Sequence, residues 1–202
     1  MKRSVTKVTD KDIYENLHNW FAEATDQEFE DGLLWYNEAQ IFTKQIAKAY
    51  GIEPYKVAGV VSALSPNNKW ERNKYDAVTV IKAHIAGIAP EDVKVCTYNP
   101  NKIKAFEILR GNTEITSKSP KTHSFAMNVG LMSPDHITID KWHLRACVTS
   151  PSDGIVDCME SCTGVQYRRL EAITADVAHS LGYKGYEIQA IIWVTIKRVW
   201  NR

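Results

Sequence analysis

The chain has 202 residues, of which 44% are hydrophobic, and a formal net charge of +1 at pH 7. This length suffices for one domain, or for two small lobes around a shared cleft, and the composition argues against a disordered chain. The near-zero charge excludes a strongly basic protein that coats nucleic acid without specificity. A local basic patch stays possible, because cations outnumber acids between residues 99 and 134.

The chain carries no apolar run long enough to cross a bilayer and no recognisable secretion signal at its start. We therefore expect a cytoplasmic protein with no membrane partner. Four cysteines stand at positions 96, 147, 158 and 162, and reduced thiols are the expected state. No C-x2-C pair occurs among them, so we expect buried or idle thiols and no metal site; an iron–sulfur or zinc site at Cys147, Cys158 and Cys162 is the alternative.

Apolar residues recur at helical spacing through most of the chain, and this predicts an all-α fold. Asp10 is the predicted N-cap of the first helix. A second helix is expected over residues 34–50 with Gly51 as its C-terminal signal, and Pro54 begins a third that ends at Pro66.

Later helices are expected near residues 70–86, 100–110, 120–130, 140–148, 164–181 and 185–200. The stretch 149–157 is rich in Ser, Pro, Asp and Gly and is predicted to be a loop. No internal repeat is visible. We expect one helical domain over residues 1–202.

The stretch EITSKSPKTHSFAMNV begins at Glu114 and places small or turn-forming residues at 116–120, before Lys121 opens a helix. Two short helices joined in this way direct backbone N–H groups and a positive helix end outward, an arrangement that suits a phosphate. Further on, HITIDKWHLRA has an apolar approach to Asp140 at a helix start, and Arg145 follows five residues later.

These segments resemble the helix-hairpin-helix DNA glycosylases of the endonuclease III type. ITSKSPKT aligns without a gap with the family's L-P-G-V-G-R-K-T, so that Lys121 and Thr122 match its K-T. IDKWHLR matches V-D-x-x-x-x-R through Asp140 and Arg145, and ALSPNNKWERNK resembles L-L-S-x-Q with Asn67 in the glutamine's place. The three matches cover roughly residues 57–147 in the family's order.

The resemblance implies helical lobes around a central cleft, with the hairpin and the catalytic segment at about 108–148. It implies a partner, double-stranded DNA with a modified or damaged base, and neither a diffusible cofactor nor an obligate protein partner. The hairpin and its surroundings supply the expected DNA contacts, which are Asn67, Ser117, Lys118, Ser119, Thr122 and Arg145.

The chemistry of base removal explains why the family needs an acid and an amine. Positive charge develops on the sugar when the glycosidic bond breaks, and Asp140 is the carboxylate predicted to stabilise it. A neutral Lys121 amine could attack C1′ and form a Schiff base, which gives lyase activity. Half-neutralising a lysine at pH 7 requires a pKa shift of about three units. The alternative for Lys121 is a solvated surface charge.

A base inside a duplex must be flipped out before it can react, and Asn67 is predicted to fill the gap. The alternative is that Asn67 caps the following helix. Trp70, Trp142 and Trp193 are candidates to stack on the flipped base, and Gln189 to read its edge; the alternative for these four is a structural role. His123, His136 and His143 match no metal motif.

Two rival functions stay open at this stage. One is a phage enzyme of the same superfamily that acts on a modified pyrimidine during thymine hypermodification. The other is a non-catalytic DNA-binding module that retains the hairpin, although such a module needs neither Lys121 nor Asp140.

Overall fold

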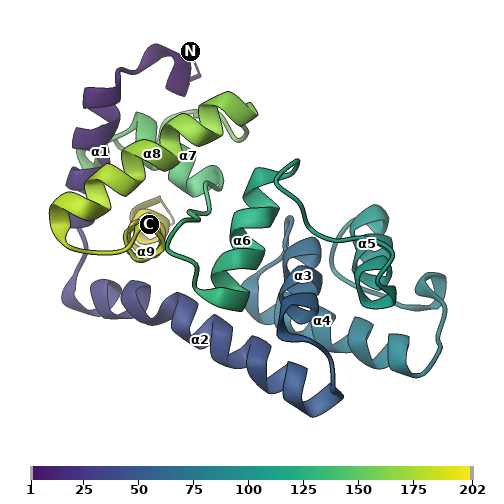
Figure 1. The fold of residues 1–202 in the computed structure, drawn as a ribbon. Helices are drawn as coiled ribbons and strands as arrows, with labels where there is room; N and C mark the ends of the chain where they lie inside the picture. Colours follow the sequence, from purple (N-terminus) through teal and green to yellow (C-terminus); the bar gives the residue numbers. More distant parts are fainter. Residues whose placement is uncertain (1, 201–202) are drawn as a thin grey trace. The chain divides into compact units, whose positions relative to one another are not determined.

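The computed structural model describes residues 2–200, which form nine α-helices and three short 3-10 helices (Figure 1). This stretch contains no β-strand, and its one isolated bridge joins Arg3 to Cys158. The predicted all-α class is confirmed. None of the described helices is both long enough and apolar enough to span a membrane.

The chain divides into two compact units. Unit 1 combines both ends of the chain, residues 1–38 and 133–202, and unit 2 is the continuous middle, residues 39–132. Helix α2 (Asp26–Tyr50) contributes residues to both units.

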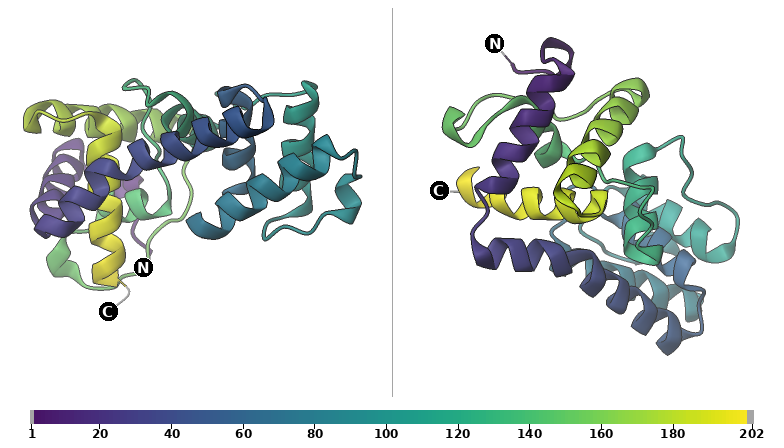
Figure 2. Two further views of the ribbon diagram at one scale, coloured as in Figure 1. Left: turned by 90° about the horizontal axis from the view of Figure 1, so that it is seen from below. Right: turned by 60° about the vertical axis from the view of Figure 1, so that its left-hand side comes forward.

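Unit 1 is built around helix α1 (Asp10–Ala22), which packs against α7 (Lys141–Val148), α8 (Gly164–Leu181) and α9 (Gly185–Trp200). Figures 1 and 2 show α1 and α8 side by side, with α9 next to both. The interior is hydrophobic and draws on all four helices, through Ile13, Leu17, Trp20, Leu144, Leu170, Ile188 and Ile192. Segments from opposite ends of the chain therefore share one core.

Two glycines in unit 1 permit close approaches. A Cβ on Gly32 of α2 would lie 2.5 Å from the Cα of Ile191, so the backbones of α2 and α9 meet at this point. A Cβ on Gly185 would lie 2.4 Å from Cδ1 of Ile137. Both distances are shorter than any ordinary carbon contact, so a side chain at either position would displace its neighbour.

Unit 2 surrounds helix α3 (Pro54–Leu64), of which residues 57–64 are all buried. Helices α4 (Trp70–Ile85), α5 (Asn99–Arg110) and α6 (Pro120–Leu131) pack against it. A Cβ on Gly130 would lie 2.8 Å from Cβ of Ala58, so α6 approaches α3 closely at its C-terminal end. The 3-10 helices are η1 (Val5–Lys7), η2 (Pro90–Asp92) and η3 (Pro151–Asp153).

Two predicted helix starts were wrong. The N-cap of α1 is Thr9, not Asp10, because the Thr9 hydroxyl accepts the Asp12 N–H at 3.1 Å. Helix α2 begins at Asp26 rather than at residue 34. Its start carries a reciprocal pair, in which Glu28 N–H donates to the Thr25 hydroxyl at 3.3 Å and Thr25 N–H donates to the Glu28 carboxylate at 3.0 Å. This T-x-x-E signature is readable in the sequence.

Candidate functional site

Asp140 is the N-cap of α7. Its Oδ1 accepts the backbone N–H groups of Trp142 at 3.0 Å and His143 at 2.9 Å, and the residue is half-buried. Two bonds to one oxygen fix the carboxylate against the positive end of its own helix. The geometry therefore holds the carboxylate of Asp140 in a defined orientation.

The residues that lead into α7, which we call the acid segment (residues 137–140), are held by side chains from α8. The Tyr167 hydroxyl donates to the carbonyl of Ile137 at 2.7 Å and accepts the N–H of Ile139 at 3.1 Å. Glu171 accepts the Ile137 N–H at 3.2 Å. The N–H and C=O groups of Ile137 and the N–H of Ile139 therefore bond to side chains. Buried backbone groups outside helices need such partners, because an unpaired buried polar group is costly.

A second tyrosine approaches the acid segment from α2. Tyr36 is buried, and its hydroxyl donates to the side-chain carbonyl of Gln189 at 2.8 Å. Burial raises the pKa of Tyr36, a hydrogen bond with Thr138 opposes the rise, and the nearby charge of Asp140 adds to it. Gln189, predicted to read a base edge, is itself buried and uses its carbonyl oxygen within the protein.

His143 lies three residues after Asp140 in the first turn of α7 and is buried. Its Nε2 lies 2.8 Å from the Thr174 hydroxyl, which already donates to the Leu170 carbonyl at 2.7 Å. The hydroxyl must therefore accept, so Nε2 carries the proton and Nδ1 is left buried without a partner. Burial lowers the pKa of His143 to about 4, so the ring is neutral at pH 7.

The predicted DNA contact Arg145 and base-pocket residue Trp142 stack on each other. The Arg145 guanidinium lies 4.5 Å from the Trp142 ring centroid and 4.9 Å from that of Trp200. Its Nη2 pairs with the Glu160 carboxylate at 3.3 Å.

Trp193 belongs to a separate aromatic contact. Its ring centroid lies 5.7 Å from that of Trp35, and the ammonium of Lys197 lies over its face. These aromatic rings are half-buried in contacts within unit 1.

The predicted hairpin lies in unit 2 between α5 and α6. Helix α5 ends at Gly111, which has a left-handed φ of 79°, and α6 begins with Pro120 in its first turn. Ser119 is the N-cap of α6 but makes no side-chain capping bond. Lys121 is exposed in the first turn, and so are the predicted contacts Ser117, Lys118 and Ser119.

Thr122, another predicted DNA contact, is tied to its surroundings on both sides. Its hydroxyl donates to the Ser119 carbonyl at 3.0 Å, and its own carbonyl accepts the Ser62 hydroxyl at 2.6 Å. Ser62 belongs to the buried helix α3. The first turn of α6 is therefore anchored to the core of unit 2, while the lysine beside it faces solvent.

Asn67 is exposed in the loop that joins α3 to α4, with a left-handed φ of 56°. Its side-chain amide donates to the Tyr98 hydroxyl at 2.7 Å. The capping alternative was wrong, because the N-cap of α4 is Lys69, which makes no side-chain bond. Tyr98 is 60% exposed, so the loop presents an amide and an aromatic ring together.

A buried carboxylate, Asp76, holds this loop in place. Asp76 accepts the Asn68 amide at 3.0 Å, the Arg72 guanidinium at 2.8 Å and the Cys96 backbone N–H at 2.8 Å. It has no exposed surface. Thr97 adds a bond to the Pro66 carbonyl at 3.1 Å. Asp76 therefore connects both loops that carry the Asn67–Tyr98 pair.

Trp70 packs in an aromatic cluster of unit 2. Its ring centroid lies 6.1 Å from that of Phe42 and 6.5 Å from that of Phe125, both in edge-on geometry. The Lys74 ammonium lies 5.6 Å from the Trp70 centroid. Phe125 is four residues after Lys121 on α6, so the two side chains share a helix face.

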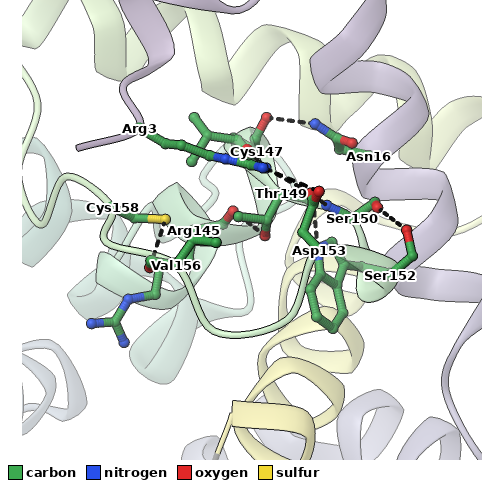
Figure 3. A network of polar contacts seen from close by, with 12 residues as sticks. Arg3, Asn16, Arg145, Cys147, Thr149, Ser150, Ser152, Asp153, Val156 and Cys158 are labelled. Atoms are coloured by element: carbon green, nitrogen blue, oxygen red, sulfur yellow. Dashed lines mark hydrogen bonds and ion pairs between the residues drawn. The ribbon is translucent and has the colours of Figure 1, made fainter. Parts of the chain in front are cut away.

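Cys147 and Cys158 belong to the hydrophobic core of unit 1, at the point where it borders a network of polar contacts around η3 (Figure 3). Figure 3 shows Cys147 and Cys158 beside the ion pair of Arg3 with Asp153, whose closest atoms are 2.6 Å apart. Cys147 is fully buried, and burial raises its pKa; the Cys158 thiol donates to the Val156 carbonyl at 3.4 Å. Within residues 2–200, no group of three or more His, Cys, Asp or Glu side chains could hold a metal ion.

Comparison with known proteins places the chain in one family. Residues 1–199 match the Family of unknown function (DUF7178). The chain belongs to this family. No curated protein and no solved structure matches the chain.

For this member of DUF7178, the predicted residues fall into two groups. Unit 1 holds Asp140, Trp142, Arg145, Gln189 and Trp193, and unit 2 holds Asn67, Trp70, Ser117, Lys118, Ser119, Lys121 and Thr122. Sequence reasoning missed Tyr36, Tyr167, Asp76 and Tyr98. Tyr167 is distant along the chain from the acid segment that it supports, and Tyr36 is distant from its partner Gln189, so no local pattern pointed to them.

Proposed function

We propose that the protein is a helix-hairpin-helix DNA glycosylase that flips out a modified or damaged base and breaks its N-glycosidic bond. The observation that carries the proposal is Asp140, a half-buried N-cap whose carboxylate is oriented by two backbone N–H groups. It occupies the acid position of the V-D-x-x-x-x-R string and is followed by Arg145. A fixed carboxylate is what a positively charged sugar transition state requires.

We also propose that Lys121 gives the enzyme lyase activity. The neutral amine attacks C1′, the bond to the base breaks, and the base leaves with its bonding electrons and takes up a proton. The C1′–O4′ bond of the resulting sugar–amine adduct then breaks as the nitrogen lone pair forms the C=N bond and O4′ takes up a proton, which gives a Schiff base. β-Elimination from this Schiff base cuts the strand. An exposed position in the first turn of α6 makes the amine accessible to a nucleic acid.

DNA binding is assigned to two features of unit 2. The exposed residues 117–119 precede the N-terminal end of α6, where backbone N–H groups and the helix dipole favour a phosphate. The Asn67–Tyr98 pair supplies an amide and an exposed ring that fit the space left by a flipped nucleotide. The fixed, left-handed Asn67 supports this role, because the loop does not have to be ordered on binding.

The Schiff base is tested by reductive trapping. Protein and duplex DNA with a single abasic site are incubated with borohydride between pH 6 and 9, and the covalent adduct is resolved by electrophoresis. The wild type is expected to give an adduct that Lys121→Ala abolishes. Lys82→Ala is the control, because Lys82 is an exposed lysine of unit 2 that is assigned no DNA contact. An adduct that survives Lys121→Ala, or none at any pH, overturns the lyase assignment.

Base removal is tested on duplexes with oxidised, deaminated, alkylated or hydroxymethylated bases, by chromatography of the released base. Release that Asp140→Asn abolishes supports the glycosylase. Release confined to hydroxymethylated pyrimidines favours the hypermodification enzyme of the same superfamily. Salt-sensitive binding of duplex DNA without any release contradicts the proposal and favours a binding module.

A further inference from the structure

A cavity of about 640 Å³ lies in unit 2, along one face of α5. Its wall includes Asn99, Lys102, Ile103 and Arg110 from the helix, and Glu91 from the segment that faces it. Cavities of about 300 to 1,000 Å³ hold small organic ligands in other proteins. The space is therefore larger than a single inorganic ion needs.

Lys102 is a buried cation in the wall of this cavity. Only 8% of its surface is exposed, and its Nζ donates to the Val93 carbonyl at 2.8 Å. Within residues 2–200, no carboxylate pairs with this ammonium. Burial of a charge is costly unless an opposite charge accompanies it, and the carbonyl takes only one of the three ammonium donors. An anion in the cavity would supply the missing charge.

Arg110 is a second cation in the same wall. Its guanidinium lies 5.8 Å from the centroid of the buried Phe106 ring, and its Nη1 pairs with Glu107 at 2.6 Å. These two contacts orient the guanidinium, which has further N–H donors. Glu107 offsets part of the Arg110 charge, whereas Lys102 has no such partner, so the larger role falls to the lysine.

We propose that this cavity binds a phosphate group, with Lys102 as its principal ligand and Arg110 as the second. Phosphate offers more acceptor oxygens than a carboxylate, so it is the anion that best matches an ammonium and a guanidinium in one wall. Tyr98, the N-cap of α5, directly precedes the lining residue Asn99, so the cavity is close to the Asn67–Tyr98 pair. A DNA strand held at that pair supplies the phosphate. The source of the phosphate rests on the proposed function, but the phosphate site does not.

The site itself is tested with pyrophosphate, through the melting temperature at constant ionic strength. At about ten times the Kd, pyrophosphate is expected to raise the melting temperature of the wild type by roughly 3 to 6 °C. Lys102→Met removes the ammonium, keeps an apolar stem and should abolish the rise. Lys104→Met is the matched control and should retain it, because Lys104 is on the same helix but does not line the cavity.

Two exposed residues of the lining keep the test informative if Lys102→Met fails to fold. Glu91→Gln removes a negative charge from the lining, so pyrophosphate should bind about threefold more tightly. Arg110→Gln removes a positive charge and should weaken binding by about the same factor. Affinities unchanged in both variants, or a folded Lys102→Met that retains the full rise, overturn the site.

The source of the phosphate is tested by duplex DNA binding over a range of salt concentrations. Each phosphate contact contributes about one to the slope of log K against log salt concentration. Lys102→Met should therefore lower the magnitude of the slope by about one, and Lys104→Met should not. Equal slopes overturn the DNA source, and a pyrophosphate site that persists would then belong to a small phosphorylated molecule. A lowered slope without base release from any substrate overturns the proposed function and supports the phosphate site.

Discussion

The acid segment of unit 1 and the Asn67 loop of unit 2 (residues 65–69) present a candidate functional side chain by different physical means. The backbone of the acid segment is held by three hydrogen bonds, two to the neutral Tyr167 hydroxyl and one to the Glu171 carboxylate. A buried carboxylate, Asp76, holds the Asn67 loop with the help of Arg72. The acid segment is therefore fixed mainly through a neutral hydroxyl of a neighbouring helix, and the Asn67 loop through a buried charge that has an ionic partner.

The largest effect is expected from Asp140→Asn. Release of the base should fall about a thousandfold, because general acid–base and electrostatic groups contribute factors of this size. Stability should change by less than about 1 kcal/mol, since asparagine caps helices as well as aspartate does. Release assays and thermal melts measure the two effects separately.

Asp135→Asn is the control for that variant, because Asp135 is exposed five residues earlier. It removes the same charge from the same region, so general electrostatic effects on DNA binding appear in both variants. A comparable rate loss in the two would mean that Asp140 has no specific role.

The sequence predicted the parts of the site that a local pattern encodes. Asp140 at the start of α7 and the turn before Lys121 follow from motifs of a few residues. Tyr36 could not be predicted, because it contacts Gln189 across 153 positions in the chain. The N-cap of α1 was missed for another reason, since Thr9 and Asp10 are both good capping residues and only the bond to Asp12 distinguishes them.

The buried, neutral ring of His143 should make the free energy of unfolding depend on pH in the acid range. The pKa of His143 is lowered to about 4 by burial, from 6.5 in the unfolded chain. Between these values the unfolded state binds the proton and the folded state does not, so stability falls as the pH drops from 6.5 to 4. The loss is about 3 kcal/mol. Urea titrations at pH 7.5, 6.5, 5.5 and 4.5 measure it.

His143→Gln should remove most of that slope. His84 on α4 of unit 2 is the comparison, because burial and the nearby cations of Arg110 and Lys56 also lower its pKa. It is only half-buried, so His84→Gln should remove a smaller part. A larger change for His84→Gln than for His143→Gln would contradict the assignment of the acid sensitivity to unit 1.

Asp76→Asn tests the ionic contact with Arg72 that helps to hold the Asn67 loop. The amide keeps an acceptor but loses the charge that pairs with Arg72, and one of its three bonded donors is left with a poorer partner. We expect a loss of about 2 kcal/mol, less than for a fully buried pair because the Arg72 side chain is 48% exposed. Glu71→Gln breaks the exposed pair with Lys74 and should cost less than about 1 kcal/mol. Equal losses in urea titrations would show that burial of Asp76 contributes nothing.

The smallest effects should come from the tip of the Asn67 loop, where backbone and side chain can be separated. Asn67→Ala forces alanine into a left-handed conformation and removes the bond to Tyr98, at about 1 kcal/mol. Tyr98→Phe removes only that exposed bond, at about 0.5 kcal/mol. Asn67→Gly removes the amide but adopts the left-handed conformation without steric strain. If the amide fills the gap left by a flipped base, Asn67→Gly should release base as slowly as Asn67→Ala while losing only the contribution of the bond to Tyr98, about 0.5 kcal/mol. Recovery of the wild-type rate with glycine would instead assign the importance of Asn67 to its backbone, and Tyr98 would become the side chain that enters the DNA.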